Sequence, residues 1–134
     1  MRKISILIPC YNEKKLIEKS LLQAINLKGI KKQIIVIDNG STDGTQKIIK
    51  KYSKKKNFKF VLRKKNLGYG CTVKQGLKMS VYKYMYIHYS DCEYDINSIY
   101  EMYDLAEKKN LDSIFGSRLK GLSSKKLIKY FRNK

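Results

Sequence analysis

Two acidic side chains, Asp91 and Glu93, flank Cys92 shortly after an apolar segment of the sequence. Carboxylate oxygens are the ligands that Mg²⁺ and Mn²⁺ prefer, and such ions usually complete their coordination with phosphate and water. A divalent ion on a diphosphate stabilises the negative charge that builds up as the diphosphate leaves. The pair therefore indicates metal-assisted chemistry on a phosphate-containing substrate, although ordinary solvated loop acids give the same pattern.

Other polar clusters follow apolar segments in the same way. They are Tyr11–Glu13, Asp38–Asp43 and Tyr89–Asp95, and Arg118 follows the last apolar segment. A short apolar run bounded by turn residues is typical of a strand buried in a parallel sheet. Because the carboxyl ends of parallel strands share one edge, where open α/β sheets bind ligands, we expect these clusters to meet there.

The elements that position these clusters alternate between strand and helix patterns. The predicted strands are Ile4–Pro9, Gln33–Ile37, Phe58–Leu62, Tyr84–His88 and Asp112–Phe115. Pro9 has no N–H and is predicted to end the first ladder. The alternation predicts an α/β fold, a mostly parallel sheet with helices on both faces.

Several residues between the strands receive a specific interpretation. Asp43 is predicted to cap the helix that follows it. In the helix after Gly68, apolar residues recur at Val73, Leu77 and Val81. His88 is the only histidine and lacks a GxSxG motif around it, which favours a structural role.

Composition narrows the class of protein. The chain has 134 residues and a net charge of +19, with 30 Lys and Arg against 11 Asp and Glu. This excess favours anionic partners, but a lysine-rich genome explains it equally well. An aromatic-basic RNA motif is absent, so nucleic acid is not the expected partner. Three cysteines without metal-finger spacing fit a reducing cytosol, and no apolar run reaches the ~20 residues of a membrane span.

Five motifs in one order resemble a family 2 glycosyltransferase. They are ISILIPCYNE, IIVIDNGSTDGT, NLGYGCTVKQGLK, DCEYD and GSR. The subgroup that they resemble most is the dolichyl- or polyprenyl-phosphate sugar transferases, which implies a GT-A fold, Rossmann-like and able to bind a nucleotide sugar. The likeness runs from Ile4 to about Gly121.

The resemblance also implies a set of site residues. Those that match nucleotide-sugar contacts of the family are Pro9, Tyr11, Glu13, Ile37, Asn39, Ser90, Asp91 and Arg118. The family usually has Asp at the position of Asn39. The Asn side chain keeps hydrogen-bonding groups at this position but brings no charge. Arg118 matches an arginine that faces the diphosphate or an acceptor phosphate.

The metal motif of the family falls on Tyr89–Glu93. Asp91 takes the place of the aspartate that binds Mg²⁺ or Mn²⁺ and assists catalysis, and Glu93 takes the place of a supporting ligand. Tyr89 replaces the first aspartate of that motif, which is a departure at the ribose and metal contacts.

The expected activity is transfer of a sugar, with inversion, from a nucleotide-diphosphate sugar to polyprenyl or dolichyl phosphate. A glycan acceptor, which needs a general base, stays open. The chain is predicted to be a single catalytic domain, 1–134, without the acceptor-side segment of the family. A catalytically weak or inactive nucleotide-sugar-binding module from a truncated or split transferase is the alternative. The expected location is the cytoplasm.

The last predicted helix, Ser124–Lys134, is basic and amphipathic. Leu127, Ile128 and Phe131 lie on one side of it, with lysines and arginine around them. Such a helix is predicted either to contact an anionic membrane surface or to pack its apolar side on the sheet.

Overall fold

The computed structural model describes residues 1–116 of the chain. The chain divides into two compact units, Met1–Tyr103 and Asp104–Lys134. The elements in chain order are β1 (Arg2–Cys10), α1 (Ile17–Asn26), β2 (Ile30–Asp38), α2 (Thr45–Lys50), β3 (Phe58–Leu62), α3 (Tyr69–Met79), β4 (Tyr84–Ile87) and α4 (Ser98–Lys109).

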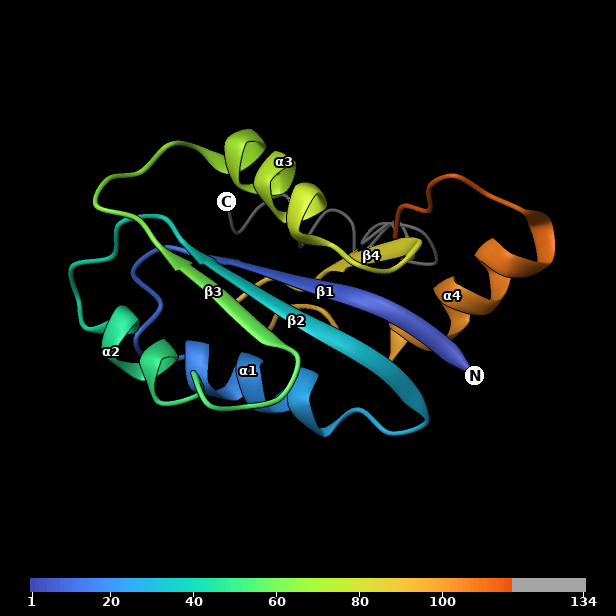
Figure 1. Cartoon of the computed structure of the whole chain (residues 1–134), viewed down its shortest axis with the longest axis horizontal. Coiled ribbons are helices and arrows are strands. Elements are labelled where there is room, and N and C mark those ends of the chain that lie inside the picture. The colour runs from blue at the N-terminus through green and yellow to red at the C-terminus, as the bar shows by residue number, and fades with distance from the viewer. Residues whose placement is uncertain (117–134) are drawn as a thin grey trace, which may run out of the picture. The chain divides into compact units, whose positions relative to one another are not determined.

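The first unit is built on a parallel four-stranded sheet (Figure 1). Its strands run in the order β3-β2-β1-β4, and all three neighbouring pairs are parallel. The chain therefore builds outward from β1 to β2 and β3, and then returns to the other side of β1 for β4. The predicted α/β class with a mostly parallel sheet is confirmed.

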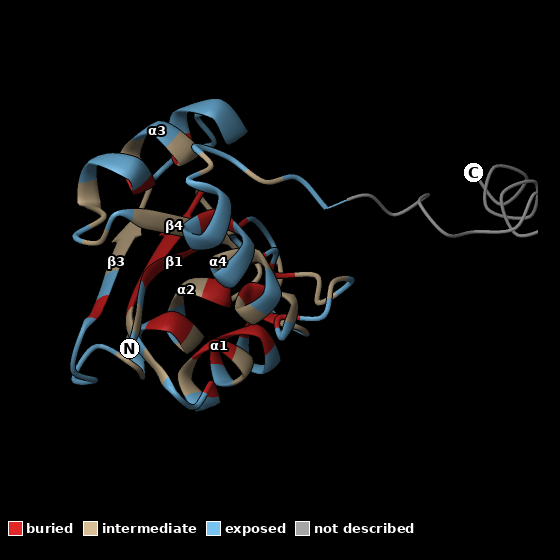
Figure 2. Ribbon diagram, turned by 90° about the vertical axis from the view of Figure 1, so that its right-hand side faces the viewer, coloured by how far each residue is buried: buried red, intermediate tan, exposed pale blue. Residues whose placement is uncertain are grey.

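Apolar side chains fill both faces of the sheet, as the alternation of each strand requires. On one face, alternate residues of β1 and β2 pack with α1, α2 and Ile99 at the start of α4. On the other face, Leu7, Ile35 and Ile37 pack with Val73 and other residues around α3. Figure 1 shows α3 on the opposite side of the sheet from α1 and α2, and Figure 2 shows β1 buried between them.

Pro9 does not end β1, which continues to Cys10. The Leu7 carbonyl accepts a hydrogen bond from the His88 amide on the β4 side. Because alternate backbone groups point to the same neighbour, the missing N–H of Pro9 also lies on the β4 side. Pairing with β4 stops at Leu7, whereas pairing with β2 continues to Cys10. Proline thus ends only the β4 ladder.

Helix α3 buries a different face from the one that its apolar residues predicted. Thr72 and Gly76 are buried, whereas Leu77 is 55% exposed and Val81, just beyond the helix, is 62% exposed. The reason is close packing, because a Cβ on Gly76 would lie 2.6 Å from Leu7 Cδ2. The small residues of α3 face the sheet, and Leu77 consequently faces outward.

Two further predictions differ from the structure. The segment 112–115, predicted as a strand, has no regular secondary structure. Gly44 occupies the N-cap position of α2, and Asp43 acts from one residue earlier, where its Oδ1 accepts a hydrogen bond from the Thr45 amide at 3.0 Å. Arg118 and the predicted helix Ser124–Lys134 lie outside the described residues. Within residues 1–116, no helix combines the length and apolarity that crossing a membrane demands.

Candidate active site at the carboxyl edge of the sheet

The strand order places a topological switch point between β1 and β4. In open α/β sheets, the crevice beyond the carboxyl ends of the strands at such a point is where ligands bind. The turns that follow β1 and β4 flank it, and the end of the β4 ladder at Ile87 leaves β1 without a neighbour on that side at Pro9. Polar residues from both turns therefore converge here.

The turn after β1 is fixed to the turn after β2 by four hydrogen bonds. The Asn12 amide donates to Ser41 Oγ at 2.8 Å, and Asn12 Oδ1 accepts from the Thr42 amide at 2.9 Å. The Glu13 amide donates to Thr45 Oγ1, and the Lys14 amide donates to Asp43 Oδ2, both at 2.9 Å.

These bonds hold Tyr11, which is 49% exposed, at the edge of the sheet. Asn12 has a positive φ of 53°, which Asn tolerates better than most residues. The sharp turn at Asn12 is what carries Tyr11 and Glu13 out of the strand.

Asp38, the last residue of β2, is buried, and its carboxylate accepts the hydrogen bonds that hold the turn after β2. Its Oδ1 accepts hydrogen bonds from the Ser41 amide at 2.9 Å and from Gln46 Nε2 at 2.6 Å. Its Oδ2 accepts a hydrogen bond from the Ser41 hydroxyl. Gly40, with φ of 88°, packs so closely that a Cβ would lie 2.8 Å from the Lys65 backbone. Asp38 is therefore committed to local structure.

Asn39 belongs to a network that reaches α3. It is 8% exposed, and its Oδ1 accepts a hydrogen bond from Arg63 Nη1 at 2.6 Å. The same guanidinium donates to Thr72 Oγ1 at 2.8 Å and to Gln75 Oε1 at 2.6 Å. Arg63 thus ties β2 to α3, and the amide oxygen of Asn39 is already engaged within the protein.

Three carboxylates from separate turns lie near one another. Burial raises the pKa of Glu13, and the charges of Asp91 and Asp43 raise it further. In contrast, the pKa of Asp43 is lowered by its hydrogen bond from the Thr45 hydroxyl and by backbone N–H donors. The effect of the Asp91 charge on the pKa of Glu13 indicates that the turn after β1 and the turn after β4 lie at the same site.

The turn after β4 presents the predicted metal-binding residues. Ser90 is buried at 5% exposure, and Cys92 has a positive φ of 57°. The Glu93 amide donates to Asp91 Oδ1 at 3.1 Å, which orients the Asp91 carboxylate.

In the described part of the chain, no group of three or more His, Cys, Asp or Glu side chains could hold a metal ion. Two carboxylates in one turn nevertheless fit Mg²⁺, which is commonly held by one or two carboxylates together with substrate phosphates.

Tyr89 joins an aromatic cluster at the same edge. Its ring stacks on Tyr69, the first residue of α3, with centroids 6.1 Å apart, and the two hydroxyls are 2.8 Å apart. Tyr94 packs on Tyr89 with centroids 5.7 Å apart. Burial and the hydrogen bond with the Tyr89 hydroxyl raise the pKa of Tyr69, so the Tyr69 phenol is neutral at physiological pH. The position where the resemblance to the family implies an aspartate therefore carries a tyrosine hydroxyl that meets Tyr69.

His88 lies beneath this turn and is 1% exposed. Neither ring nitrogen has a hydrogen-bond partner among the described residues. Burial lowers the pKa of His88, and the nearby charge of Asp91 only partly opposes this effect. The histidine is buried as the sequence indicated, but its ring is not satisfied by hydrogen bonds.

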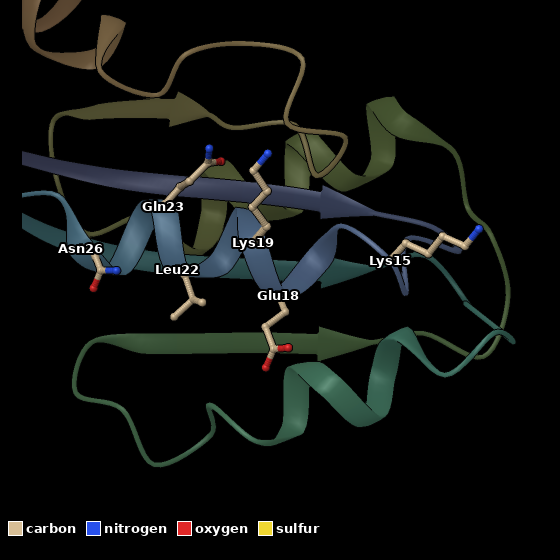
Figure 3. A pocket seen from close by; sticks show the side chains of 6 residues that line it. All are labelled: Lys15, Glu18, Lys19, Leu22, Gln23 and Asn26. Atoms are coloured by element: carbon tan, nitrogen blue, oxygen red, sulfur yellow. The ribbon is translucent and has the colours of Figure 1, made fainter.

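A shallow groove of about 610 Å³ runs along the outer side of α1. Figure 3 shows the side chains that line it, which are Lys15, Glu18, Lys19, Leu22, Gln23 and Asn26. None of the predicted site residues lines this groove. Its lysine end adjoins the turn that carries Glu13, so the groove approaches the edge of the sheet without containing the site.

The structure thus brings the turns of Tyr11, Glu13 and Asp91 to one edge, and it buries three predicted residues, among them Ser90. Ile37 is fully buried in the core beneath α3, and Asn39 is occupied by Arg63. Arg63 itself was not predicted, although it directly follows the strand Phe58–Leu62. Residues that follow the carboxyl end of a strand are candidates for the site, and Arg63 meets this criterion as well.

Comparison with known sequences supplies a family. A model described as "Glycosyl transferase family 2" matches residues 5–133. A poly-beta-1,6-N-acetyl-D-glucosamine synthase of Staphylococcus epidermidis is 32% identical over 123 residues, which are 90% of this chain and 30% of that protein. The synthase of the same name from Staphylococcus aureus strain COL is 36% identical over 99 residues, 74% of this chain and 24% of that protein. The chain therefore spans about a third or less of these relatives.

Solved structures show the same fold. TarS 1-349 of S. aureus, solved in complex with UDP-GlcNAc, matches with a TM-score of 0.70 at 23% identity, over 92% of this chain and 37% of that chain. The mannosyltransferase PcManGT of Pyrobaculum calidifontis, in complex with GDP-Man and Mn²⁺, matches with a TM-score of 0.52 over 57% of this chain and 24% of that chain. The GT-A-like architecture is thereby confirmed.

Proposed function

Because the chain belongs to glycosyl transferase family 2, we propose that it transfers a sugar from a nucleotide-diphosphate sugar to an acceptor. The observation that carries this proposal is the convergence of the turns after β1 and β4 at the switch point. Glu13 and Asp91 come from these two turns, and after burial the charge of Asp91 is the next cause that raises the pKa of Glu13. The donor is bound across this edge, with its diphosphate at the turn 89–93.

The residues of the two turns divide the work of holding the donor. Tyr11, half-exposed beyond β1, contacts the nucleoside together with Pro9 and the turn of Glu13. Asn39 acts through Arg63, which anchors the first residues of α3. Ser90 and Asp91 lie at the diphosphate, and Arg118 supplies a cation on the acceptor side.

Asp91 and Glu93 would hold Mg²⁺ or Mn²⁺. Bound there, the ion would neutralise the diphosphate and stabilise the charge that develops on it as the glycosidic bond breaks. Glu13, Asp43 and Asp91 give this edge a local negative charge within a strongly basic chain. A diphosphate is itself anionic, so a cation between these groups would offset their repulsion.

The names of the relatives favour N-acetylglucosamine as the sugar and a growing glycan as the acceptor. Lipid phosphate, the acceptor predicted from the sequence, remains the second candidate because it is ionised at neutral pH and needs no general base. A glycan hydroxyl does need one. Peripheral contact with the cytoplasmic face of a membrane would place the site near either acceptor.

A non-catalytic nucleotide-sugar-binding module is the alternative, and the neutral Tyr89 in the metal motif is the observation that favours it. Both functions predict nucleotide binding, so turnover is what separates them. The test is release of nucleoside diphosphate from a panel of nucleotide sugars, with Mn²⁺ or chelator and with soluble glycan or polyprenyl phosphate. Metal-dependent release above that of an Asp91→Asn variant supports the transferase. Binding without any release supports the module.

A further inference from the structure

The acidic residues of this chain are strongly segregated. Between Asp43 and Asp91 the sequence contains twelve lysines and one arginine, and no Asp or Glu. This stretch includes α2, β3, α3 and β4. Strand β1 also lacks acids, and β2 has only Asp38 at its carboxyl end. Apart from Asp38 at the carboxyl end of β2, the elements that bound the face of the sheet covered by α3 therefore carry only positive charges.

Lysines surround α3 on that face. Lys74 and Lys78 are exposed one helical turn apart on α3 itself. Lys59 of β3 is exposed and pairs in register with Ile35, which belongs to the core beneath α3. Because paired residues of neighbouring strands share a face, Lys59 lies on the α3 side of the sheet.

Two more lysines lie at the other end of the helix. Gln33 Nε2 donates to the Met79 carbonyl at 3.0 Å, so the end of α3 is fixed above Gln33. Lys31 precedes Gln33 by two residues and is paired in register with Lys3. Both lysines are exposed, and the period of two places them on the α3 side as well.

Apolar side chains lie exposed among these lysines. Leu77 is 55% exposed between Lys74 and Lys78, and Val81 is 62% exposed next to the end of α3. The Val81 amide donates to Gln33 Oε1 at 3.0 Å, so its position above the sheet is fixed. We define the α3 surface by these residues: Lys3, Lys31, Lys59, Lys74, Lys78, Leu77 and Val81.

We propose that the α3 surface docks this protein on an anionic lipid bilayer, with Leu77 and Val81 entering the interface and the five lysines contacting headgroups. Lysine is a compact, strongly hydrated point charge on a flexible stem, which suits a diffuse field of lipid headgroups. Each lysine near such a surface contributes to binding, and exposed apolar residues add to it. The first residue of α3 is Tyr69, in the candidate active site, so docking would hold that site close to the bilayer.

The chemistry of the surface favours lipid over nucleic acid. Sequence-specific contacts to bases rely on bidentate Arg, Asn or Gln, and single strands are bound by aromatic stacking. The one arginine of the basic stretch, Arg63, is engaged with Asn39, Thr72 and Gln75. Aliphatic Leu77 and Val81 have no role on a phosphate backbone. The inference concerns binding alone and does not depend on the proposed transferase activity.

The test is sedimentation of the full 134-residue chain with phosphatidylcholine vesicles that contain or lack phosphatidylglycerol. The variant is Lys74→Glu/Lys78→Glu, and the matched control is Lys47→Glu/Lys50→Glu on α2, which covers the opposite face and changes the net charge equally. We expect binding only to anionic vesicles, weakened at least about 30-fold in the α3 variant and far less in the control. Leu77→Ser should weaken binding roughly tenfold without changing its salt dependence.

Equal losses in the two charge variants would overturn the proposal, because they would reflect net charge and no particular surface. It would also be overturned by unchanged binding of Leu77→Ser together with tight, salt-dependent binding of duplex DNA, which would assign the surface to nucleic acid. Circular dichroism and thermal melting of each variant show that the fold is retained. Nucleotide binding measured in parallel separates failure of this inference from failure of the active-site proposal.

Discussion

Arg63 stabilises the turn after β2, which carries Asn39. Its guanidinium makes three short hydrogen bonds, to Asn39, Thr72 and Gln75, in a forked geometry that an ammonium cannot reproduce. We predict that Arg63→Lys destabilises the protein by about 1–2 kcal/mol because two of the acceptors lose their donor. Chemical denaturation measures this, with exposed Lys64→Arg as the control. Equal stability of Arg63→Lys and the wild type would show that the network contributes nothing.

The same network changes what is expected of Asn39. From the sequence, Asn39→Asp would strengthen a hydrogen bond to the nucleoside, since charge-assisted bonds are about twice as strong as neutral ones. In the structure, the carboxylate would instead pair with Arg63. A stabilising effect of Asn39→Asp is consequently a test of the network, whereas its effect on donor affinity remains a prediction.

Tyr89 stands where the metal motif of the family has an aspartate. We predict that Tyr89→Asp raises the affinity for Mn²⁺ in the absence of nucleotide by about tenfold or more, because it adds a third carboxylate beside Asp91 and Glu93. Tyr89→Phe is the matched control, since it removes only the hydroxyl that meets Tyr69. Titration calorimetry with MnCl₂ measures both. If Tyr89→Asp and Tyr89→Phe bind Mn²⁺ alike, the turn after β4 is not a metal site.

His88 makes stability depend on pH. Burial lowers the pKa of His88 in the folded state below the ordinary value of about 6.5. The unfolded chain therefore takes up a proton more readily, so this contribution to stability is full above pH 6.5 and is lost as pH falls below it. We expect thermal melts to drop between pH 7.5 and 5.5 by more in the wild type than in His88→Leu. Identical pH profiles would show that the ring is protonated or solvated when folded.

The sequence predicted where helix α3 lies in the chain, but it did not predict which face of the helix is buried. Its place between β3 and β4 follows from the glycine turn and the helical spacing. Which face it buries does not follow from the apolar residues, because Leu77 and Val81 are exposed. Packing distance decided the outcome: Gly76 allows the helix to approach Leu7 closely. A close approach between a helix and a sheet requires glycine at the point of contact. The spacing of apolar residues does not reveal where that contact is.

Two glycines of α3 provide a matched test of this packing. A Cβ on Gly76 would lie 2.6 Å from buried Leu7, whereas a Cβ on Gly70 meets nothing within 4 Å. We predict that Gly76→Ala destabilises the protein by about 1–3 kcal/mol through overpacking. Gly70→Ala should be neutral or stabilising by up to about 1 kcal/mol, because alanine favours helix. Denaturant unfolding compares them, and equal effects of the two substitutions would contradict the packing of α3 against Leu7.

Strands were easier to predict than their ends. The apolar cores of β1 and β2 mark buried parallel strands, but both strands extend beyond them, through Arg2 and Lys3 and through Ile30–Lys32. Polar residues at strand ends pair as well as apolar ones because the ladder uses only backbone groups. The prediction that Pro9 ends its strand was wrong for a related reason, since the effect of a proline depends on which neighbouring strand its nitrogen faces. The strand order of the sheet determines this neighbour, and the sequence of one strand does not.

For the whole molecule, the sequence predicted the parallel α/β class and the edge at which its polar clusters gather, and it did not predict the strand order. The order β3-β2-β1-β4 matters because it puts the turns of Glu13 and Asp91 on either side of the switch point. Arg118 lies outside the described residues, so its role remains a prediction. The apolar run of β2 predicts the burial of Ile37, whereas no local pattern indicates the burial of Asn39.

The distribution of charge over the molecule leads to the central claim. Acids gather at the carboxyl edge of the sheet in a chain of net charge +19, so the edge that should receive an anionic diphosphate is locally negative. We propose that a divalent cation held by Asp91 and Glu93 resolves this conflict. Nucleotide binding should therefore require the metal and the Asp91 carboxylate together.

Titration calorimetry of UDP against the protein, in Mn²⁺ and in chelator, tests this claim most directly. We predict that UDP binds in Mn²⁺ and that its affinity falls at least about tenfold in chelator and equally in Asp91→Asn. Glu101→Gln, which removes an exposed carboxylate from α4, should leave binding unchanged. Equal UDP affinity in Mn²⁺ and in chelator, unaffected by Asp91→Asn, would contradict the assignment of the carboxyl edge as a metal-dependent nucleotide site.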